Sequence, residues 1–143
     1  MREANFSELM GKTLTEVEGF STDSGEIYFT CSDGKKYKMY HCRNCCESVY
    51  IESIDGDVND LIGHPILLAS EEENHENPPE LEEEDRSDSF TWTFYKLSTI
   101  KGSVTIRWYG ASNGYYSESV DFEEVDSVIA KRNIEWFILK GIR

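Results

Sequence analysis

The chain has 143 residues, a length that suits one domain and allows roughly two thirds of the unfolded surface to be buried without metal or disulfide cross-links. Its formal net charge is −14, and it lacks the basic surface through which proteins bind phosphates, which argues against direct DNA or RNA binding. It has no apolar run of about eighteen residues and no secretory leader, so we expect a cytoplasmic protein that does not span a membrane.

The first half of the chain reads as short strands separated by turns. A short helix over 6–10 is expected, with Asn5 or Ser7 as its cap and Gly11 as its stop. Alternating segments on both sides of Asp33-Gly34 predict a hairpin. One helical turn is expected over 57–62. Strands are predicted over 14–19, 26–31, 36–41, 49–54 and 65–69.

Residues 71–88 contain ten acidic residues and one Arg, which is −9 of the total charge. With two prolines and one Leu, this run cannot bury enough apolar surface to order itself. It is predicted to be a mobile acidic insertion in a single domain that spans residues 1–143. The alternative is a surface that engages a basic partner.

The stretch from Ser89 to Phe122 is rich in aromatic residues and predicts three antiparallel strands that form the centre of the fold. Phe90, Trp92 and Phe94 are expected on the same face as Val104, Ile106 and Trp108. That register needs a three-residue loop over 100–102 with a left-handed Gly102, and a bulge near 95–97.

The second turn of this stretch is predicted to be an odd-numbered loop centred on Gly114. It would pair Trp108 with Val120, Ile106 with Phe122, and Arg107 with Asp121 as opposite charges. Residues 127–139 are expected to form an amphipathic helix, although 136–139 also suit a strand. The predicted class is α+β, dominated by antiparallel sheet, with short helices.

A cluster of thiols and one imidazole is a weak candidate for a zinc site. Zinc requires four ligands in tetrahedral array, and only one C-x2-C pair occurs here. Adjacent cysteines in an extended chain project to opposite sides, and a structural disulfide is not expected in the cytoplasm. Buried, unliganded cysteines are the alternative. The candidate ligands are His41, Cys42, Cys45 and Cys46.

The loop after Trp108 is the better candidate for function. The aromatic rings of this loop can stack on a nucleobase, and its amide and carboxylate can hydrogen-bond to the edge of that base. The guanidinium group of Arg107 can bind a phosphate. The alternative is that Trp108 and Tyr116 complete the core and that the loop only turns. The common enzymatic motifs are absent, so no catalytic residue is assigned. The predicted ligand-binding residues are Arg107, Trp108, Tyr109, Asn113, Tyr115, Tyr116 and Glu118.

Several motifs of the chain are specific enough to suggest a family. They are Gly11-Lys12-Thr13-Leu14, Asp33-Gly34 followed by Tyr37, Met39-Tyr40-His41, Cys45-Cys46-Glu47-Ser48-Val49, Ile54-Asp55-Gly56-Asp57, Asp60-Leu61-Ile62-Gly63, Ser89-Phe90-Thr91-Trp92-Thr93-Phe94-Tyr95, Arg107-Trp108-Tyr109-Gly110 and Asn113-Gly114-Tyr115-Tyr116-Ser117. In these motifs the chain resembles a family of small bacteriophage and prophage proteins, a domain of unknown function. The resemblance spans roughly residues 11–122, and the chain departs from it at Cys42 and after Phe122.

The resemblance implies a phage protein that acts in the host cytoplasm against host defence. Our hypothesis is a non-enzymatic protein that binds a small planar ligand, such as a nucleotide signal, in a pocket of the kind that homo-oligomers form between subunits. The alternative is an acidic inhibitor that binds a nucleic-acid-binding host defence protein through residues 71–88. A zinc-containing domain is the second alternative; the first two need no cofactor.

Overall fold

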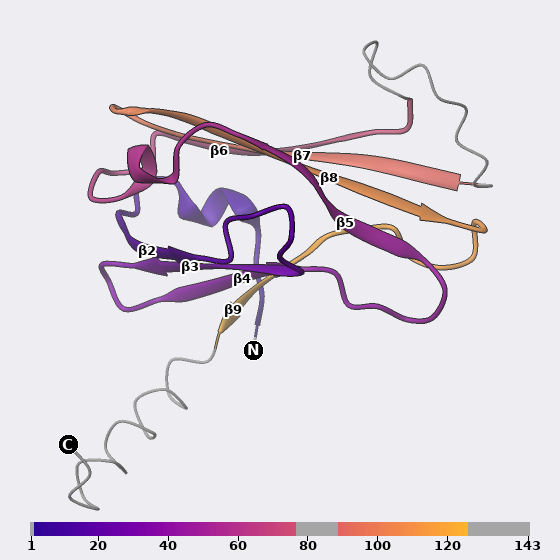
Figure 1. Cartoon of the computed structure of the whole chain (residues 1–143). Coiled ribbons are helices and arrows are strands. Elements are labelled where there is room, and N and C mark those ends of the chain that lie inside the picture. Colours follow the sequence, from indigo (N-terminus) through magenta and orange to yellow (C-terminus); the bar gives the residue numbers. More distant parts are fainter. Residues whose placement is uncertain (1, 77–88, 126–143) are drawn as a thin grey trace, which may run out of the picture.

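Two antiparallel sheets lie face to face in the computed structural model, which describes residues 2–76 and 89–125 (Figure 1). The five-stranded sheet has the spatial order β1 (Arg2–Glu3), β9 (Asp121–Val125), β4 (Lys36–Tyr40), β3 (Glu26–Cys31) and β2 (Leu14–Glu18). The four-stranded sheet has the order β5 (Ser48–Asp55), β8 (Gly102–Ser112), β7 (Ser89–Thr99) and β6 (Leu68–Asn74).

The antiparallel, sheet-dominated prediction is confirmed, but the α+β class is wrong. Within the described ranges the helical segments are single 3-10 turns, η1 (Phe6–Leu9) and η2 (Val58–Leu61). Two residues after each turn the chain reverses at a glycine with positive φ, Gly11 at 82° and Gly63 at 84°, a conformation that an L side chain disfavours. Neither turn is long or apolar enough to cross a membrane. The helix predicted over 127–139 lies outside the described residues.

The local predictions of the N-terminal half are confirmed. Asn5 precedes η1, and its backbone N–H donates to the Glu8 carboxylate at 2.8 Å. The hairpin β3–β4 pairs from Glu26↔Tyr40 to Thr30↔Lys36. Its turn is completed by Gly34, whose φ is 89°. These elements were predictable because their signals lie within a few residues of each other.

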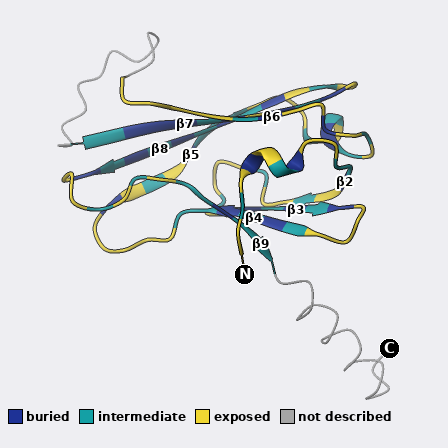
Figure 2. Ribbon diagram, turned by 180° about the vertical axis from the view of Figure 1, so that it is seen from behind, coloured by how far each residue is buried: buried dark blue, intermediate teal, exposed yellow. Residues whose placement is uncertain are grey.

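The core lies between the sheets, where the alternate residues of each strand meet (Figure 2). Exposed residues gather on the outer faces and in the loops. Trp108 is among the largest fully buried side chains, and its indole N–H donates to the Met39 sulfur at 3.3 Å. The largest fully buried residues are Trp108, Tyr37, Tyr95, Phe29, Leu9, Leu14, Ile27, Met39, Ile51, Leu61, Ile66 and Leu97.

The hairpin β7–β8 has a different register from the predicted one. Pairing runs without a shift from Ser89↔Ser112 to Thr99↔Gly102, so the turn has two residues and the predicted bulge near 95–97 is absent. Gly102 has no positive φ. A Cβ on Gly102 would lie 2.7 Å from the Asp60 carboxylate, so Gly102 is set by its contact with this side chain and not by a left-handed conformation.

This register reverses the expected faces of β7. Tyr95 pairs with Ile106 and Leu97 with Val104, and all four are buried between the sheets. Because side chains alternate along a strand, Phe90, Trp92 and Phe94 lie on the outer face instead. The prediction failed because both faces of β7 carry large apolar residues, and the inward face also contains threonines that resemble outward residues. The buried threonines are Thr91, Thr93 and Thr99.

The third predicted strand exists but belongs to the other sheet. After β8 the chain crosses over, and β9 pairs with β4 and β1. The expected partners of β8 are therefore wrong: Trp108 pairs with Ile51, and Ile106 with Ile54. Phe122 turns inward and stacks on Tyr37, with ring centroids 5.2 Å apart. This packing favours the sheet switch over a continued meander.

The acidic run begins inside a strand. β6 shares only Leu68 and Ala69 with the strand predicted over 65–69, and it continues through Glu71, Glu72 and Glu73, which pair with β7 as far as Asn74↔Trp92. Glutamates fit here because β6 is the edge of its sheet and most of its side chains are exposed. The rest of the predicted insertion, over 77–88, lies outside the described residues.

Candidate functional site

The seven predicted ligand-binding residues do not share one surface. Trp108 is 1% exposed and lies between the sheets. Its neighbours Arg107 and Tyr109 point to the outer face of the four-stranded sheet, because consecutive residues of a strand alternate. Tyr115 is 82% exposed in the loop that follows β8. The structure therefore separates the residues that the sequence places together.

The loop over 113–120 is held by its own polar groups. The Asn113 side chain accepts the Tyr115 backbone N–H at 2.9 Å. The Glu118 carboxylate accepts the hydroxyl of Ser112 and, at 2.8 Å, that of Thr91. Tyr115 and Tyr116 contact each other edge to face at 5.0 Å. Asn113 and Glu118 thus stabilise the loop with the groups that were expected to read a ligand.

A different aromatic group forms on the outer face of the four-stranded sheet. Tyr109 contacts Trp92 at 4.6 Å, Tyr50 at 5.8 Å and Phe90 at 6.3 Å between ring centroids. We call these four residues the outer aromatic face. Tyr50 is 46% exposed, whereas Trp92 is 3% exposed. Of these four residues, only Tyr109 was predicted as a site residue. The alternation of Phe90 and Trp92 with polar residues indicated that both lie on one face of the strand, but that face was predicted to be the core.

Arg107 borders the outer aromatic face and is bound to a carboxylate. Its Nε lies 2.6 Å from Glu52 Oε2, and its guanidinium carbon lies 5.1 Å from the centre of the Trp92 ring. Glu52 reaches it because the β5–β8 pairing shifts between Ile51 and Ser53, which leaves Glu52 as an extra residue. A phosphate at Arg107 would compete with this carboxylate, so the positive charge is largely neutralised.

His41 and Glu47 form a buried pair at the start of β5. His41 Nε2 lies 2.8 Å from Glu47 Oε2, and its Nδ1 lies 2.7 Å from the Ser119 carbonyl oxygen. The backbone N–H groups of Asn44 and Cys45 also donate to the Glu47 carboxylate, each at 2.8 Å. Both imidazole nitrogens are therefore occupied, and the pair fastens residues 41–47 to the 113–120 loop.

The Glu47 network predicts a pH-dependent contribution to stability. Backbone donors hold the pKa of Glu47 at about 2, below its usual 4.5. Because the folded-state pKa is the lower one, this contribution is complete above about pH 4.5 and is lost as pH falls towards 2. Glu47→Gln should therefore lower the urea midpoint of unfolding at pH 7. The difference in this midpoint between Glu47→Gln and the wild type should be smaller at pH 3. A difference in midpoint that stays constant with pH would contradict the low pKa of Glu47. The control is Glu16→Gln, a substitution at an exposed position of β2.

The cysteines do not form the weakly predicted zinc site. Among the described residues no group of three or more His, Cys, Asp or Glu side chains is placed to hold a metal. The Sγ atoms of Cys45 and Cys46 lie next to each other. They lie in a bend rather than in an extended strand, so they do not project to opposite sides. Cys42 is a free, exposed thiol.

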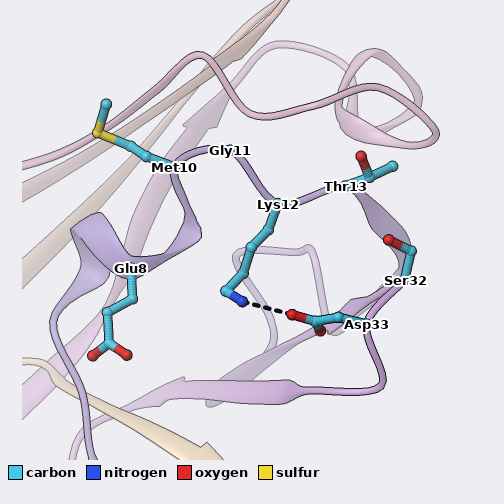
Figure 3. A pocket seen from close by; sticks show the side chains of 7 residues that line it. All are labelled: Glu8, Met10, Gly11, Lys12, Thr13, Ser32 and Asp33. Atoms are coloured by element: carbon cyan, nitrogen blue, oxygen red, sulfur yellow. Dashed lines mark hydrogen bonds and ion pairs between the residues drawn. The ribbon is translucent and has the colours of Figure 1, made fainter.

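A polar pocket of about 420 Å³ opens where η1 meets the turn of the β3–β4 hairpin (Figure 3). Lys12 reaches across it to Asp33, with 2.6 Å between Nζ and Oδ2. This contact raises the pKa of Lys12 and lowers the pKa of Asp33. Lys12 therefore stays protonated near neutral pH, which makes it a hydrogen-bond donor and a poor nucleophile. The lining residues are Glu8, Met10, Gly11, Lys12, Thr13, Ser32 and Asp33.

Two buried side chains close to this pocket, Cys31 and Tyr37, keep their protons. Burial raises the pKa of Cys31 to about 11, so its thiol is neutral and unreactive at neutral pH. The fully buried Tyr37 hydroxyl has no hydrogen-bond partner within the described part of the chain. Burial also raises the pKa of Tyr37, so the hydroxyl keeps its proton. This region is suited to polar contacts, not to nucleophilic chemistry.

Comparison with known proteins gives one match. A family model described as a domain of unknown function (DUF7448) matches residues 7–122. No curated protein and no solved structure matches the chain. The matched range contains β2 to β8, the outer aromatic face and the polar pocket.

Proposed function

The chain belongs to the domain of unknown function family DUF7448, and we propose that it is a non-enzymatic binding domain that holds a small planar ligand on its outer aromatic face. The observation that supports this most is the continuous contact of Tyr50, Tyr109, Trp92 and Phe90 on one side of a rigid sheet. The ligand class is a nucleobase or a ring of similar shape, as in a nucleotide signal.

The accessible part of this face determines how the ligand binds. Tyr50 is 46% exposed and lies on the edge strand β5, opposite Tyr109 on β8. The two phenol rings are tilted by 60° to each other, so a flat ring can stack on Tyr50 and contact Tyr109 at an angle, while the buried Trp92 packs against Tyr109. Stacking on an aromatic side chain contributes about 1–3 kcal/mol per base.

The charges near this face favour the base over the phosphates. Arg107 is already paired with Glu52 at 2.6 Å, and the chain carries a net charge of −14. A polyphosphate would meet general repulsion, and binding it at Arg107 would require displacement of the Glu52 carboxylate. We therefore expect a nucleoside or cyclic nucleotide to bind more tightly than the corresponding triphosphate.

Calorimetric titration with adenosine, cyclic AMP and ATP tests the proposal. The wild type should bind the first two more tightly than ATP. Tyr50→Ala should weaken this binding at least about tenfold, because one stacked ring is lost. Tyr28→Ala is the matched control, since Tyr28 also lies on an outer face, that of the five-stranded sheet, and should leave binding unchanged. Equal binding by both variants, or no heat with any ligand, would contradict the proposal.

In the phage setting that the resemblance implies, this binding would sequester a nucleotide signal of the host. The same substitution then gives a biological test. Phage that carry Tyr50→Ala should lose protection against a nucleotide-signalling defence, whereas phage that carry Tyr28→Ala should keep it. Protection that survives Tyr50→Ala would separate counter-defence from ligand binding.

A further inference from the structure

The polar pocket between η1 and the turn of the β3–β4 hairpin is not used by the proposed function (Figure 3). Its volume of about 420 Å³ lies near the lower end of the range for small-molecule sites, about 300–1,000 Å³. It therefore has room for one small ring. Of its seven lining residues, Met10 is the one with a large apolar side chain. This lining suits a polar ligand better than an aromatic one.

The charged groups that line the pocket are held in pairs. Lys12 Nζ lies 2.6 Å from Asp33 Oδ2. Glu8 Oε1 lies 2.8 Å from Arg2 Nη2. The two positive and two negative charges cancel, and a strongly charged ligand would have to compete with one of these charge-assisted contacts. The pocket therefore favours an uncharged ligand.

The polar groups that remain available in the pocket are hydrogen-bond donors. An ammonium group has three N–H donors, and within the described part of the chain Lys12 uses one of them, on Asp33. The side-chain hydroxyls of Thr13 and Ser32 line the pocket and make no hydrogen bond to another described residue. A ligand with several acceptor oxygens would match these donors.

A buried hydroxyl behind the pocket indicates the same chemistry. Tyr37 is 0% exposed, and its hydroxyl has no hydrogen-bond partner within residues 2–76 and 89–125. Burial raises the pKa of Tyr37, and the charges that act on this pKa most are those of Lys12 and then Glu8, which both line the pocket. The hydroxyl therefore lies close to Lys12. Because a buried donor without a partner is costly, an acceptor oxygen that enters beside Lys12 would be stabilising.

We propose that this pocket binds an uncharged, hydroxyl-rich small molecule of the monosaccharide class. The hydroxyl oxygens of the sugar would accept hydrogen bonds from Lys12, Thr13 and Ser32. With a shift of the flexible Lys12 side chain, one of them would also accept the hydrogen bond that Tyr37 lacks. The sugar hydroxyls can donate in turn to the Asp33 carboxylate, whose oxygens each accept more than one hydrogen bond. The pocket shares no residue with the outer aromatic face.

An NMR titration of the full chain tests the ligand class. The probes are D-glucose, D-galactose and D-ribose, with D-glucuronate as the charged counterpart of glucose. At least one neutral sugar should shift the backbone amide signals of Gly11, Lys12 and Asp33. Glucuronate should bind several-fold more weakly than glucose, because the chain carries a net charge of −14. If no neutral sugar shifts these signals, or if glucuronate binds more tightly than glucose, the proposal is wrong.

Tyr37→Phe tests whether the sugar reaches the buried hydroxyl. Since this hydroxyl has no partner among the described residues, its removal should leave the urea midpoint of the free protein unchanged or higher. The same substitution should weaken sugar binding about three- to tenfold, the effect of one lost hydrogen bond. A lower midpoint would show that the hydroxyl is already satisfied without a ligand, and unchanged sugar binding would show that the sugar does not reach it. Either result would contradict the proposal.

Thr13→Val gives a second variant, which removes a hydroxyl and keeps the shape of the side chain. It should weaken sugar binding about three- to tenfold. The matched control is Thr15→Val, on β2 outside the pocket lining, which should leave binding unchanged. Equal binding by these two variants would overturn the proposal. Tyr50→Ala should bind the sugar as the wild type does, and a loss of binding in that variant would place the sugar on the outer aromatic face instead.

Discussion

Trp108→Ala should lower the free energy of unfolding by about 3–5 kcal/mol, the range for removing a large buried aromatic side chain. Trp108 is 1% exposed and lies between the two sheets. The substitution removes a large apolar surface from the core and leaves a cavity that the paired strands cannot fill. It also removes the indole N–H that donates to the Met39 sulfur at 3.3 Å. Urea unfolding followed by far-UV circular dichroism measures the change.

The matched control for this prediction is Tyr115→Ala. Tyr115 was expected to form a site together with Trp108, but it is 82% exposed. Its replacement should change stability by less than about 0.5 kcal/mol, as is usual for surface positions. If the two substitutions have similar effects, Trp108 is not a core residue and the assigned faces of β8 are wrong.

Gly56→Ala should destabilise the fold by at least about 2–3 kcal/mol, because two penalties act together. Gly56 follows β5 with φ of 112°, a conformation that L residues rarely adopt. An added Cβ would lie 2.4 Å from the Ser103 carbonyl oxygen and 3.0 Å from the Val104 Cα, both in the backbone of β8. The backbone of a paired strand cannot move aside as a flexible side chain does. Thermal or urea unfolding measures the loss.

Gly25→Ala is the control for the close approach at Gly56. A Cβ on Gly25 would meet nothing within 4 Å, and its φ is not positive. This substitution should be neutral or slightly stabilising, because Ala restricts the unfolded chain. A Gly56→Ala protein as stable as Gly25→Ala would contradict the placement of Gly56 against β8.

The sequence predicts elements whose signals are local. The Asp33-Gly34 turn, the η1 turn after Asn5 and the η2 turn before Gly63 are all found where they were expected. Each depends on residues within one turn or one hairpin. The capping residue and the conformation of the glycine specify such elements locally, without a contribution from long-range packing.

The shared face of Val104, Ile106 and Trp108 on β8 was predicted correctly, but the faces of β7 could not be predicted in the same way. A shift of one residue between the strands exchanges the inner and outer sets. Phe90 and Trp92 looked like core residues, while the inward Thr93 looked like a surface residue. The correct choice depends on which face meets the other sheet, and that information lies in β9, in β4, with which β9 pairs, and in the loop that joins β8 to β9. Tertiary packing therefore decided the register.

The candidate site was predicted from residues that are neighbours in the sequence. Trp108 and Tyr109 are consecutive residues of β8, so their side chains lie on opposite faces in any register. Trp108 is buried, and Tyr109 joins Tyr50 from β5, a residue 59 positions earlier in the chain. No local motif connects these two tyrosines. The Arg107 and Glu52 pair, which was expected to be Arg107 and Asp121, was missed for the same reason.

Aromatic NMR during a ligand titration tests the central claim most directly. The ring signals of Tyr50 and Tyr109 should shift progressively as adenosine or cyclic AMP is added, because a stacked base changes their magnetic environment. The ring signals of Tyr28 and Tyr40, on the outer face of the five-stranded sheet, should stay in place. Shifts confined to Tyr28, Tyr40 or Tyr115, or no shifts at saturating ligand, would contradict binding at the outer aromatic face.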